Sequence, residues 1–253
     1  MNDPTPRRDR LAIVTGATGA IGSAISRRLV ADGARVALFA RNDRRLERLE
    51  QAIGAPERVL RSRGDVTQAF DLVEARDAVR DRFGADPDLV VVSAGTFRAS
   101  SFEAAVPSEW DAMIGTNIQG VLHTVQTFSE GVHAAAEEGR AADIVLIGSA
   151  IAEKRTTAFA VYSAISAAVE QLAKHLRDEF GARGVRVHHI APYYVTSQLG
   201  ADMSDAEWFR EVQSQFVEYE SIAPESVADL ASFMVSLPAR ANFAEATIRP
   251  LKS

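Results

Sequence analysis

Short apolar runs alternate with longer helical patterns along almost the whole of this 253-residue chain. Apolar runs separated by helices predict parallel strands whose sheet is covered on both faces. Right-handed crossovers then give one α/β domain, a Rossmann-like doubly wound fold with a mainly parallel sheet of about seven strands. The predicted strands are 11–15, 35–40, 58–63, 88–92, 143–148, 185–190 and 246–249. The predicted helices are 21–31, 43–53, 67–83, 107–136 (two helices or a bent one), 159–180 and 224–237.

Composition narrows the class of protein further. The chain has no cysteine, which rules out disulfides and thiolate metal sites, and a formal net charge of −6, which argues against nucleic-acid or membrane partners. His188 and His189 alternate faces on a predicted strand, so they cannot ligate one metal ion, and we expect no metal. No apolar run is long enough to span a membrane. We expect a cytoplasmic protein with a flexible tail at 1–9 and a single domain at 10–253.

A glycine-rich turn, T-G-A-T-G-A-I-G at 15–22, follows the first strand and opens the first helix. Small residues let the backbone approach a pyrophosphate, and the start of a helix supplies free N–H groups. Such turns also form simply to pack a helix on a strand. Their position between the first strand and the first helix favours nucleotide binding, with Gly16, Thr18 and Ile21 as candidate contacts.

This turn resembles the T-G-x-x-x-G-x-G motif of the short-chain dehydrogenase/reductase family, with Ala20 at the middle glycine. The resemblance continues to about residue 250 and implies a nicotinamide dinucleotide cofactor. Arg41 ends the second strand where an acidic residue would bind the ribose of NAD; arginine pairs instead with a 2′-phosphate, which favours NADP over NAD. By the same resemblance, Asp65 and Val66 would meet the adenine. Asp65 is equally suited to cap the helix predicted to start at Thr67.

Further matches locate the other half of the cofactor and the active site. After the fourth strand, Ala94 and Gly95 would keep the backbone close to the cofactor. Ser149 ends the fifth strand, and Tyr162 follows thirteen residues later on a helix. In the family the tyrosine is the general acid/base for a carbonyl oxygen that the serine also binds. Asn117 matches an asparagine that kinks a helix and holds a water of a proton relay; alternatively it is a helix residue that bonds to backbone.

Two residues depart from the family pattern near the nicotinamide end. Ser166 stands where Y-x-x-x-K places a lysine that grips the ribose and lowers the tyrosine pKa. Tyr193 replaces a glycine of the P-G-x-V-x-T motif, in which Val195 and Ser197 would contact the cofactor. Lys154 is the only lysine close enough in sequence to substitute, and a solvent-exposed loop charge is the more common role for such a residue.

The leading hypothesis is an NADP(H)-dependent oxidoreductase that uses Ser149 and Tyr162 to reduce a small ketone or related C=O or C=N group. Tyr162 and Ser166 would also bond to the cofactor. The alternatives are a redox-neutral isomerase, cyclase or dehydratase, and a non-catalytic partner of an active homologue. Residues 196–219 are a candidate lid over a small-molecule substrate. The sequence at 236–250 resembles the short-tailed, NADP-linked branch of this family, which acts on small hydroxy acids and related carbonyls. The resemblance also implies a homodimer or homotetramer built on the helix of Tyr162.

Overall fold

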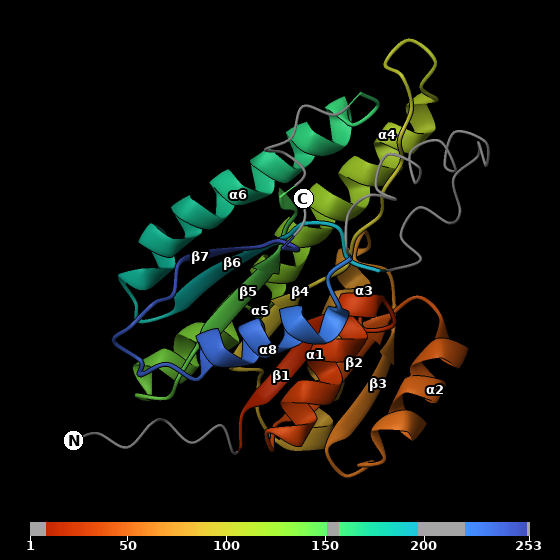
Figure 1. Ribbon diagram of the computed structural model, residues 1–253. Coiled ribbons are helices and arrows are strands. Elements are labelled where there is room, and N and C mark those ends of the chain that lie inside the picture. Colours follow the sequence, from red (N-terminus) through yellow and green to blue (C-terminus); the bar gives the residue numbers. More distant parts are fainter. Residues whose placement is uncertain (1–8, 151–156, 197–220, 252–253) are drawn as a thin grey trace.

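The computed structural model describes residues 9–150, 157–196 and 221–251, which form a twisted sheet with helices on both faces (Figure 1). The sheet has seven strands in the order β3-β2-β1-β4-β5-β6-β7, and all neighbours are parallel. The strand order reverses between β1 and β4, and ligands bind at this point in such folds. The strands are β1 Leu11–Thr15, β2 Arg35–Ala40, β3 Val59–Arg63, β4 Leu89–Val92, β5 Asp143–Ile147, β6 Arg186–Pro192 and β7 Glu245–Ile248.

Two apolar cores cover the two faces of the sheet, because alternate residues of each strand point to opposite sides. Ala12 and Val14 pack with α1, α2 and α8, whereas Leu11 and Ile13 pack with α3, α5 and α6. The prediction of a doubly wound α/β domain is therefore confirmed. The helices are α1 Ala20–Ala31, α2 Asp43–Ile53, α3 Ala69–Phe83, α4 Pro107–Ile114, α5 Gly120–Glu137, α6 Ala160–Gly181 and α8 Pro224–Val235.

One helical segment is interrupted as expected, and another helix starts later than expected. The prediction of two helices or a bent one at 107–136 is confirmed, because α4 and α5 are joined by a π-helical turn, η1 Gly115–Gln119. The prediction that α3 starts at Thr67 is wrong, because the helix begins at Ala69. Oδ1 of Asp65 accepts hydrogen bonds from the backbone N–H and the hydroxyl of Thr67, at 2.9 and 3.0 Å. This local turn competes with the helical conformation.

Buried charges are paired at the amino edge of the sheet, in a set of five residues that we call the amino-edge network. Asp143 is fully buried and accepts hydrogen bonds from Arg186 at 2.7 and 3.0 Å and from Arg10 at 2.8 Å. Nε2 of His188 lies 2.9 Å from the same carboxylate, and Arg10 also donates to Asp88. Burial alone would raise the pKa of Asp143, but Arg10, His188 and Arg186 hold it well below its usual range.

The amino-edge network also anchors the end of α8. Nη2 of Arg186 donates to the carbonyl of Val235 at 3.0 Å, and Nη1 donates to that of Leu237 at 2.6 Å. Within the described ranges, no cluster of three or more histidine or acidic residues is arranged to hold a metal ion. Likewise, none of the helices in the described part of the chain is long and apolar enough to cross a membrane.

Candidate active site

The glycine-rich turn brings the end of β1 against the segment that follows β4. Gly16 has φ +65°, and a Cβ at this position would lie 2.6 Å from the Cα of Ala94. Only glycine therefore fits here without displacing backbone. No described side chain caps the start of α1, where Gly19 is the N-cap residue. Thr18 and Ile21 flank this point, and both are partly exposed. A helix start of this kind suits an anionic pyrophosphate.

Arg41 and Asp65 lie next to each other where β2 and β3 end. The Arg41 side chain is 73% exposed, and its Nη1 lies 4.0 Å from Oδ2 of Asp65. Because Asp65 bonds to Thr67, it does not cap α3, whose N-cap residue is Gln68. Val66 is buried. The arrangement leaves an exposed guanidinium at the end of the sheet where the adenine half of a dinucleotide is expected.

Asn117 lies in the π-helical turn and joins it to the loop after β4. Its Oδ1 accepts a hydrogen bond from the backbone N–H of Thr96, and its Nδ2 donates to the carbonyl of the same residue, both at 2.8 Å. The regular α-helix is interrupted at this residue, and a kink there stays a prediction. The amide holds the backbone next to Gly95, while the role of Asn117 in a water relay stays a prediction.

Ser149 and Tyr162 meet at the carboxyl edge of the sheet, where β5 leads to α6, and their hydroxyl groups form a hydrogen bond. The rings of Tyr162 and Phe97 meet edge to face, with their centroids 4.9 Å apart and their planes at 84°. Burial of the phenol raises the pKa of Tyr162, and hydrogen bonds with Ser149 and Ser166 offset this rise only in part. The phenol is therefore neutral at physiological pH and carries a proton that it can donate.

Ser166 supplies no charge at the position of the expected lysine. It is 7% exposed, and its hydroxyl donates to the backbone carbonyl of Tyr162 at 2.9 Å. Lys174, further along α6, is paired with Glu170 at 2.6 Å. Lys154 lies outside the described residues. Ser166, which replaces the expected lysine, is therefore hydrogen-bonded within its own helix.

The ring of Tyr193 packs against the core on the α1 and α8 side of the sheet. The guanidinium of Arg249 lies over this ring, 5.7 Å from its centroid. Val195 is buried and pairs with Ile222 in an isolated parallel bridge, which joins the two ends of the segment 197–220. Ser197 and nearly all of the candidate lid at 196–219 lie outside the described residues, as do residues 1–8 of the expected tail.

A comparison with known protein families identifies the fold's relatives. Residues 10–208 match the sequence profile of the short chain dehydrogenase family. The chain belongs to the short-chain dehydrogenase family. An uncharacterized oxidoreductase of Staphylococcus epidermidis is 30% identical over 246 residues, which cover 96% of this chain and 98% of the relative. An uncharacterized oxidoreductase of Staphylococcus aureus is 29% identical over 243 residues, which cover 96% and 98% of the two chains.

Solved structures of other dehydrogenases share the fold. An alcohol dehydrogenase from Thermococcus sibiricus, in complex with 5-hydroxy-NADP, superposes with a TM-score of 0.82 at 24% identity, covering 97% of this chain and 98% of that one. A serine dehydrogenase in complex with NADP⁺ superposes with a TM-score of 0.85 at 24% identity, covering 95% of each chain. At this identity, the likeness concerns the fold alone.

Sequence reasoning missed several residues that shape the site in this short-chain dehydrogenase. Phe97 packs on the phenol, and His189 fills the space beside Gly148, where the ring would collide with any added Cβ. His189 is 3% exposed, and its Nε2 has no hydrogen-bond partner in the described structure. The glycine directly before Ser149 was the available signal, since a glycine at the end of a strand often marks a close approach.

Proposed function

We propose that this short-chain dehydrogenase is an NADP(H)-dependent oxidoreductase that reduces a small ketone or a related C=O or C=N group. The observation that carries the proposal is the neutral phenol of Tyr162, hydrogen-bonded to Ser149 at the carboxyl edge of the sheet. The uncapped start of α1 beside Gly16 supports a dinucleotide at the same edge. Membership of the family and the NADP-type ligands of two structural neighbours agree with this cofactor.

Tyr162 and Ser149 divide the work of the proposed reduction. A reduced nicotinamide, when bound, supplies the hydride. Ser149 donates a hydrogen bond to the carbonyl oxygen and orients it, and Tyr162 transfers its phenolic proton to that oxygen as it becomes an alcohol. The phenolate left behind takes a proton from water. Alcohol oxidation needs the phenolate first, and the raised pKa of Tyr162 disfavours this form, so we propose reduction as the favoured direction.

Arg41 is the proposed reader of the 2′-phosphate of NADP. Its side chain is mostly exposed at the end of β2, and a guanidinium can bind a phosphate through two parallel N–H bonds. The carboxylate of Asp65 lies 4.0 Å from the guanidinium. The same carboxylate would repel a phosphate that is not held by Arg41, so the preference for NADP depends on this one arginine.

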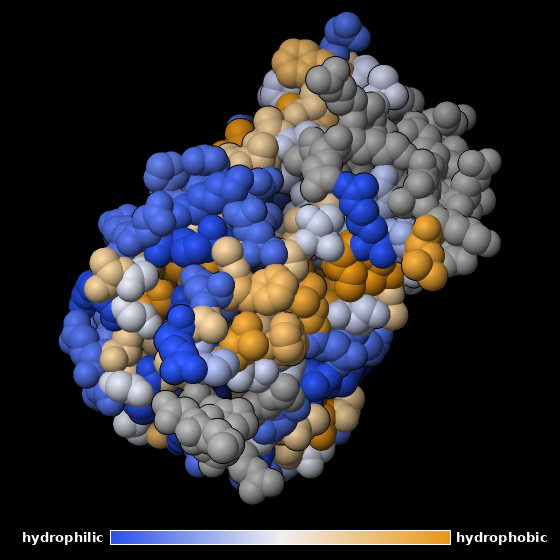
Figure 2. Space-filling view, turned by 60° about the vertical axis from the view of Figure 1, so that its left-hand side comes forward, coloured by the Kyte–Doolittle hydropathy of each residue, from blue (hydrophilic) through white to orange (hydrophobic). Residues whose placement is uncertain are grey.

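We also propose a homo-oligomer built on α4, α5 and α6. Ile114 and Leu122 are exposed apolar residues, and α6 exposes Ala164, Ala167 and Ala168, which permit close helix packing. Figure 2 shows a further gathering of apolar side chains near the middle of one face, bordered by hydrophilic ones. We expect size-exclusion chromatography with light scattering to give the mass of a dimer or tetramer. The Leu122→Asp variant should give a lower mass, because the oligomer dissociates.

The experiment that tests the proposed function is turnover of a ketone with NADPH, compared with the Tyr162→Phe variant. NADPH fluorescence on binding is measured for both proteins, so that weaker cofactor binding in the variant is distinguished from loss of the proton donor. Consumption of NADPH by the native protein and its loss in the variant are expected. If a ketone is consumed equally by both proteins, Tyr162 is not the proton donor.

One observation favours a second candidate, a redox-neutral enzyme or a non-catalytic partner of an active homologue: the uncharged Ser166 stands at the position of the lysine and is bonded to its own helix. The Ser166→Lys variant separates the possibilities. A rise in NADPH-dependent reduction identifies a weakened reductase. A fall in the native activity shows that the serine belongs to a different reaction.

A further inference from the structure

The ring of Tyr162 packs on an aromatic cluster that two distant segments of the chain build together. Phe97 and Phe159 are both buried, and their ring centroids lie 5.1 Å apart. Tyr162 packs against this pair and meets Phe97 edge to face. Aromatic rings prefer this arrangement, because the positive edge of one ring then faces the negative face of the other. The contact therefore restricts the orientation of the phenol as well as its position.

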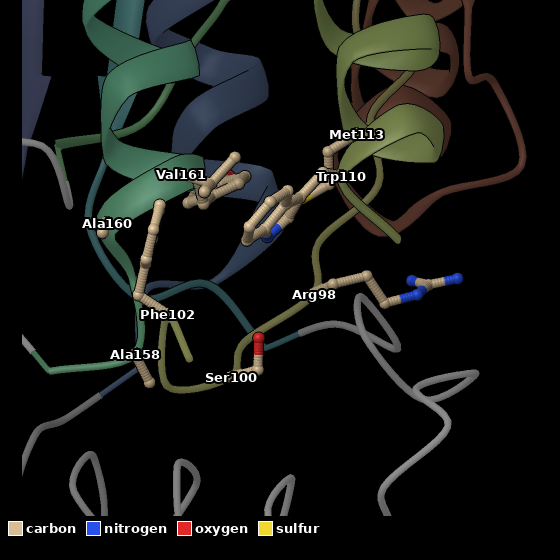
Figure 3. Close-up of a pocket in the computed structure, with 9 residues that line it drawn as sticks. Arg98, Ser100, Phe102, Trp110, Met113, Ala158, Ala160 and Val161 are labelled. Atoms are coloured by element: carbon tan, nitrogen blue, oxygen red, sulfur yellow. The ribbon is translucent and has the colours of Figure 1, made fainter. Parts of the chain in front are cut away.

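Hydrogen bonds fix the main chain from which the ring of Phe97 extends. The amide of Asn117 makes two hydrogen bonds to the backbone of Thr96, the residue before Phe97. Nη1 of Arg98 donates to the carbonyl of Phe97 at 2.8 Å and to the hydroxyl of Thr96 at 3.0 Å. The guanidinium of Arg98 points away from the start of α6 (Figure 3). Bonds on both sides of Phe97 thus leave its ring little freedom to move relative to α6.

The loop after β4 is also tied to the segment that leads into α6, and Figure 3 shows the two passing each other. The N–H of Ser100 in this loop donates to the carbonyl of Ala158 at 3.2 Å. Phe159 follows as the N-cap residue of α6, and Tyr162 lies in the first turn of this helix. A shift of the loop would therefore reach the phenol through packed rings and backbone bonds.

A proton donor must lie within hydrogen-bond reach of the atom that receives the proton, so a phenol that turns away from Ser149 cannot act on a carbonyl held there. We infer that Phe97 is a positioning residue whose ring keeps the phenol of Tyr162 turned toward Ser149. Asn117 contributes to the reaction by holding the main chain from which Phe97 extends. This inference rests on the proposed function, because it assigns Phe97 a part in proton donation by Tyr162.

The first test compares ketone reduction by the native protein and by Phe97→Leu, which keeps an apolar side chain but removes the aromatic ring. We expect kcat to fall by about tenfold and KM for NADPH to change by less than about twofold, since a small misplacement of a catalytic group is costly. The matched control is Phe128→Leu in the core against the sheet, which should lower stability and leave kcat unchanged. A higher KM for the ketone at unchanged kcat would show that Phe97 lines the substrate site instead, and would overturn the inference.

A double variant tests the link between Asn117 and Phe97. If Asn117 acts through Phe97, the double variant Asn117→Ala with Phe97→Leu should reduce ketones about as fast as Asn117→Ala alone, because residues that act as one unit are not additive. Losses that multiply would mean that Asn117 acts independently of Phe97, for example through the expected water relay. That result would overturn the role inferred for Asn117.

The mobility of the phenol ring separates this inference from the proposed function, because it is measured without turnover. In protein labelled with ¹³C-tyrosine, the NMR signals of Tyr162 are those that Tyr162→Phe lacks. Phe97→Leu should speed the flipping of this ring several-fold, and Phe128→Leu should not. Unchanged flipping in Phe97→Leu would overturn the inference, whatever the activity. Faster flipping together with no reduction of any ketone by the native protein keeps the hold of Phe97 on the ring and rejects the reductase.

Discussion

The two edges of the parallel sheet use polar groups in opposite ways. At the amino edge, Asp143 and its neighbours are charged, buried and bonded to one another. At the carboxyl edge, Ser149 and Tyr162 are neutral hydroxyl groups, and the start of α1 has no side-chain cap. Paired buried charges fix the strands and the end of α8, whereas neutral groups and uncapped N–H groups remain available for a ligand. This difference predicts that the stability of the fold depends on the amino edge and that the reaction depends on the carboxyl edge.

The largest effect on catalysis is expected at the carboxyl edge, from Tyr162→Phe. Loss of a proton donor should lower kcat for ketone reduction by about 10²–10⁴-fold. The denaturant midpoint should hardly move, because the ring and its contact with Phe97 are retained. Stopped-flow kinetics and urea unfolding check the two halves of this statement. A large loss of stability would contradict the division between the edges.

The largest effect on stability is expected at the amino edge, from Asp143→Asn. This change leaves the buried guanidinium groups of Arg10 and Arg186 short of a negative charge, and breaking such a pair costs about 3–5 kcal/mol of unfolding free energy. Urea unfolding measures the change. The matched control is Asp77→Asn, which removes an exposed partner of Arg76 and should cost less than about 1 kcal/mol.

A smaller effect is expected where the adenine half of the cofactor would bind. Arg41→Ala should weaken NADPH binding by about 10–100-fold, since a hydrogen bond to a charged group contributes about 1.5–3 kcal/mol. Binding of NADH should stay nearly unchanged, because it lacks the 2′-phosphate. Fluorescence titration with both cofactors measures the preference, and Arg44→Ala, at the start of α2, is the control. An unchanged preference in Arg41→Ala would mean that another group reads the phosphate.

The smallest effect concerns the pH dependence of stability, through His189 beside Gly148. Burial lowers the pKa of this imidazole below 6.5, its ordinary value, so the folded protein binds a proton less readily than the unfolded chain does. The contribution of His189 is therefore fully present above pH 6.5 and is lost as pH falls through the folded pKa.

Urea unfolding of the native protein and of His189→Leu from pH 7.5 downward should reveal this contribution as a shallower acid loss in the variant. His175→Leu is the control, because that ring is exposed on α6 and bonds to Gln171. Parallel pH profiles for the native protein and His189→Leu would show that the buried ring does not titrate in this range.

The fold could be predicted closely because its signals are local. The apolar runs at 11–15 and 35–40 coincide with β1 and β2, and the pattern at 43–53 coincides with α2. The pairing of Ser149 with Tyr162 was accessible through the spacing that the family shares. The interruption of the segment 107–136 was also predicted. The late start of α3 depends on the local turn between Asp65 and Thr67, which is harder to foresee.

The surroundings of the candidate site depend on contacts between distant parts of the chain, and no local pattern specifies them. Asn117 holds Thr96 through both atoms of its amide, and Phe97 lies against Tyr162, 65 residues further along the chain. The stacking of Phe102 on Trp110 also requires the loop after β4 to fold back over α4. The sequence therefore indicates which groups can react, and the packing determines what they meet.

The bridge between Val195 and Ile222 has a consequence for how this protein can diversify. The backbone N–H of Ile222 also donates to the carbonyl of Tyr194 at 2.8 Å, so Val195 and Ile222 are held side by side by backbone bonds of their own. An insertion or deletion between these two positions can consequently leave the bridge in place, since the entropic cost of closing a loop grows only slowly with its length. Related proteins can in this way change the substrates that they bind while they keep the same seven-stranded sheet.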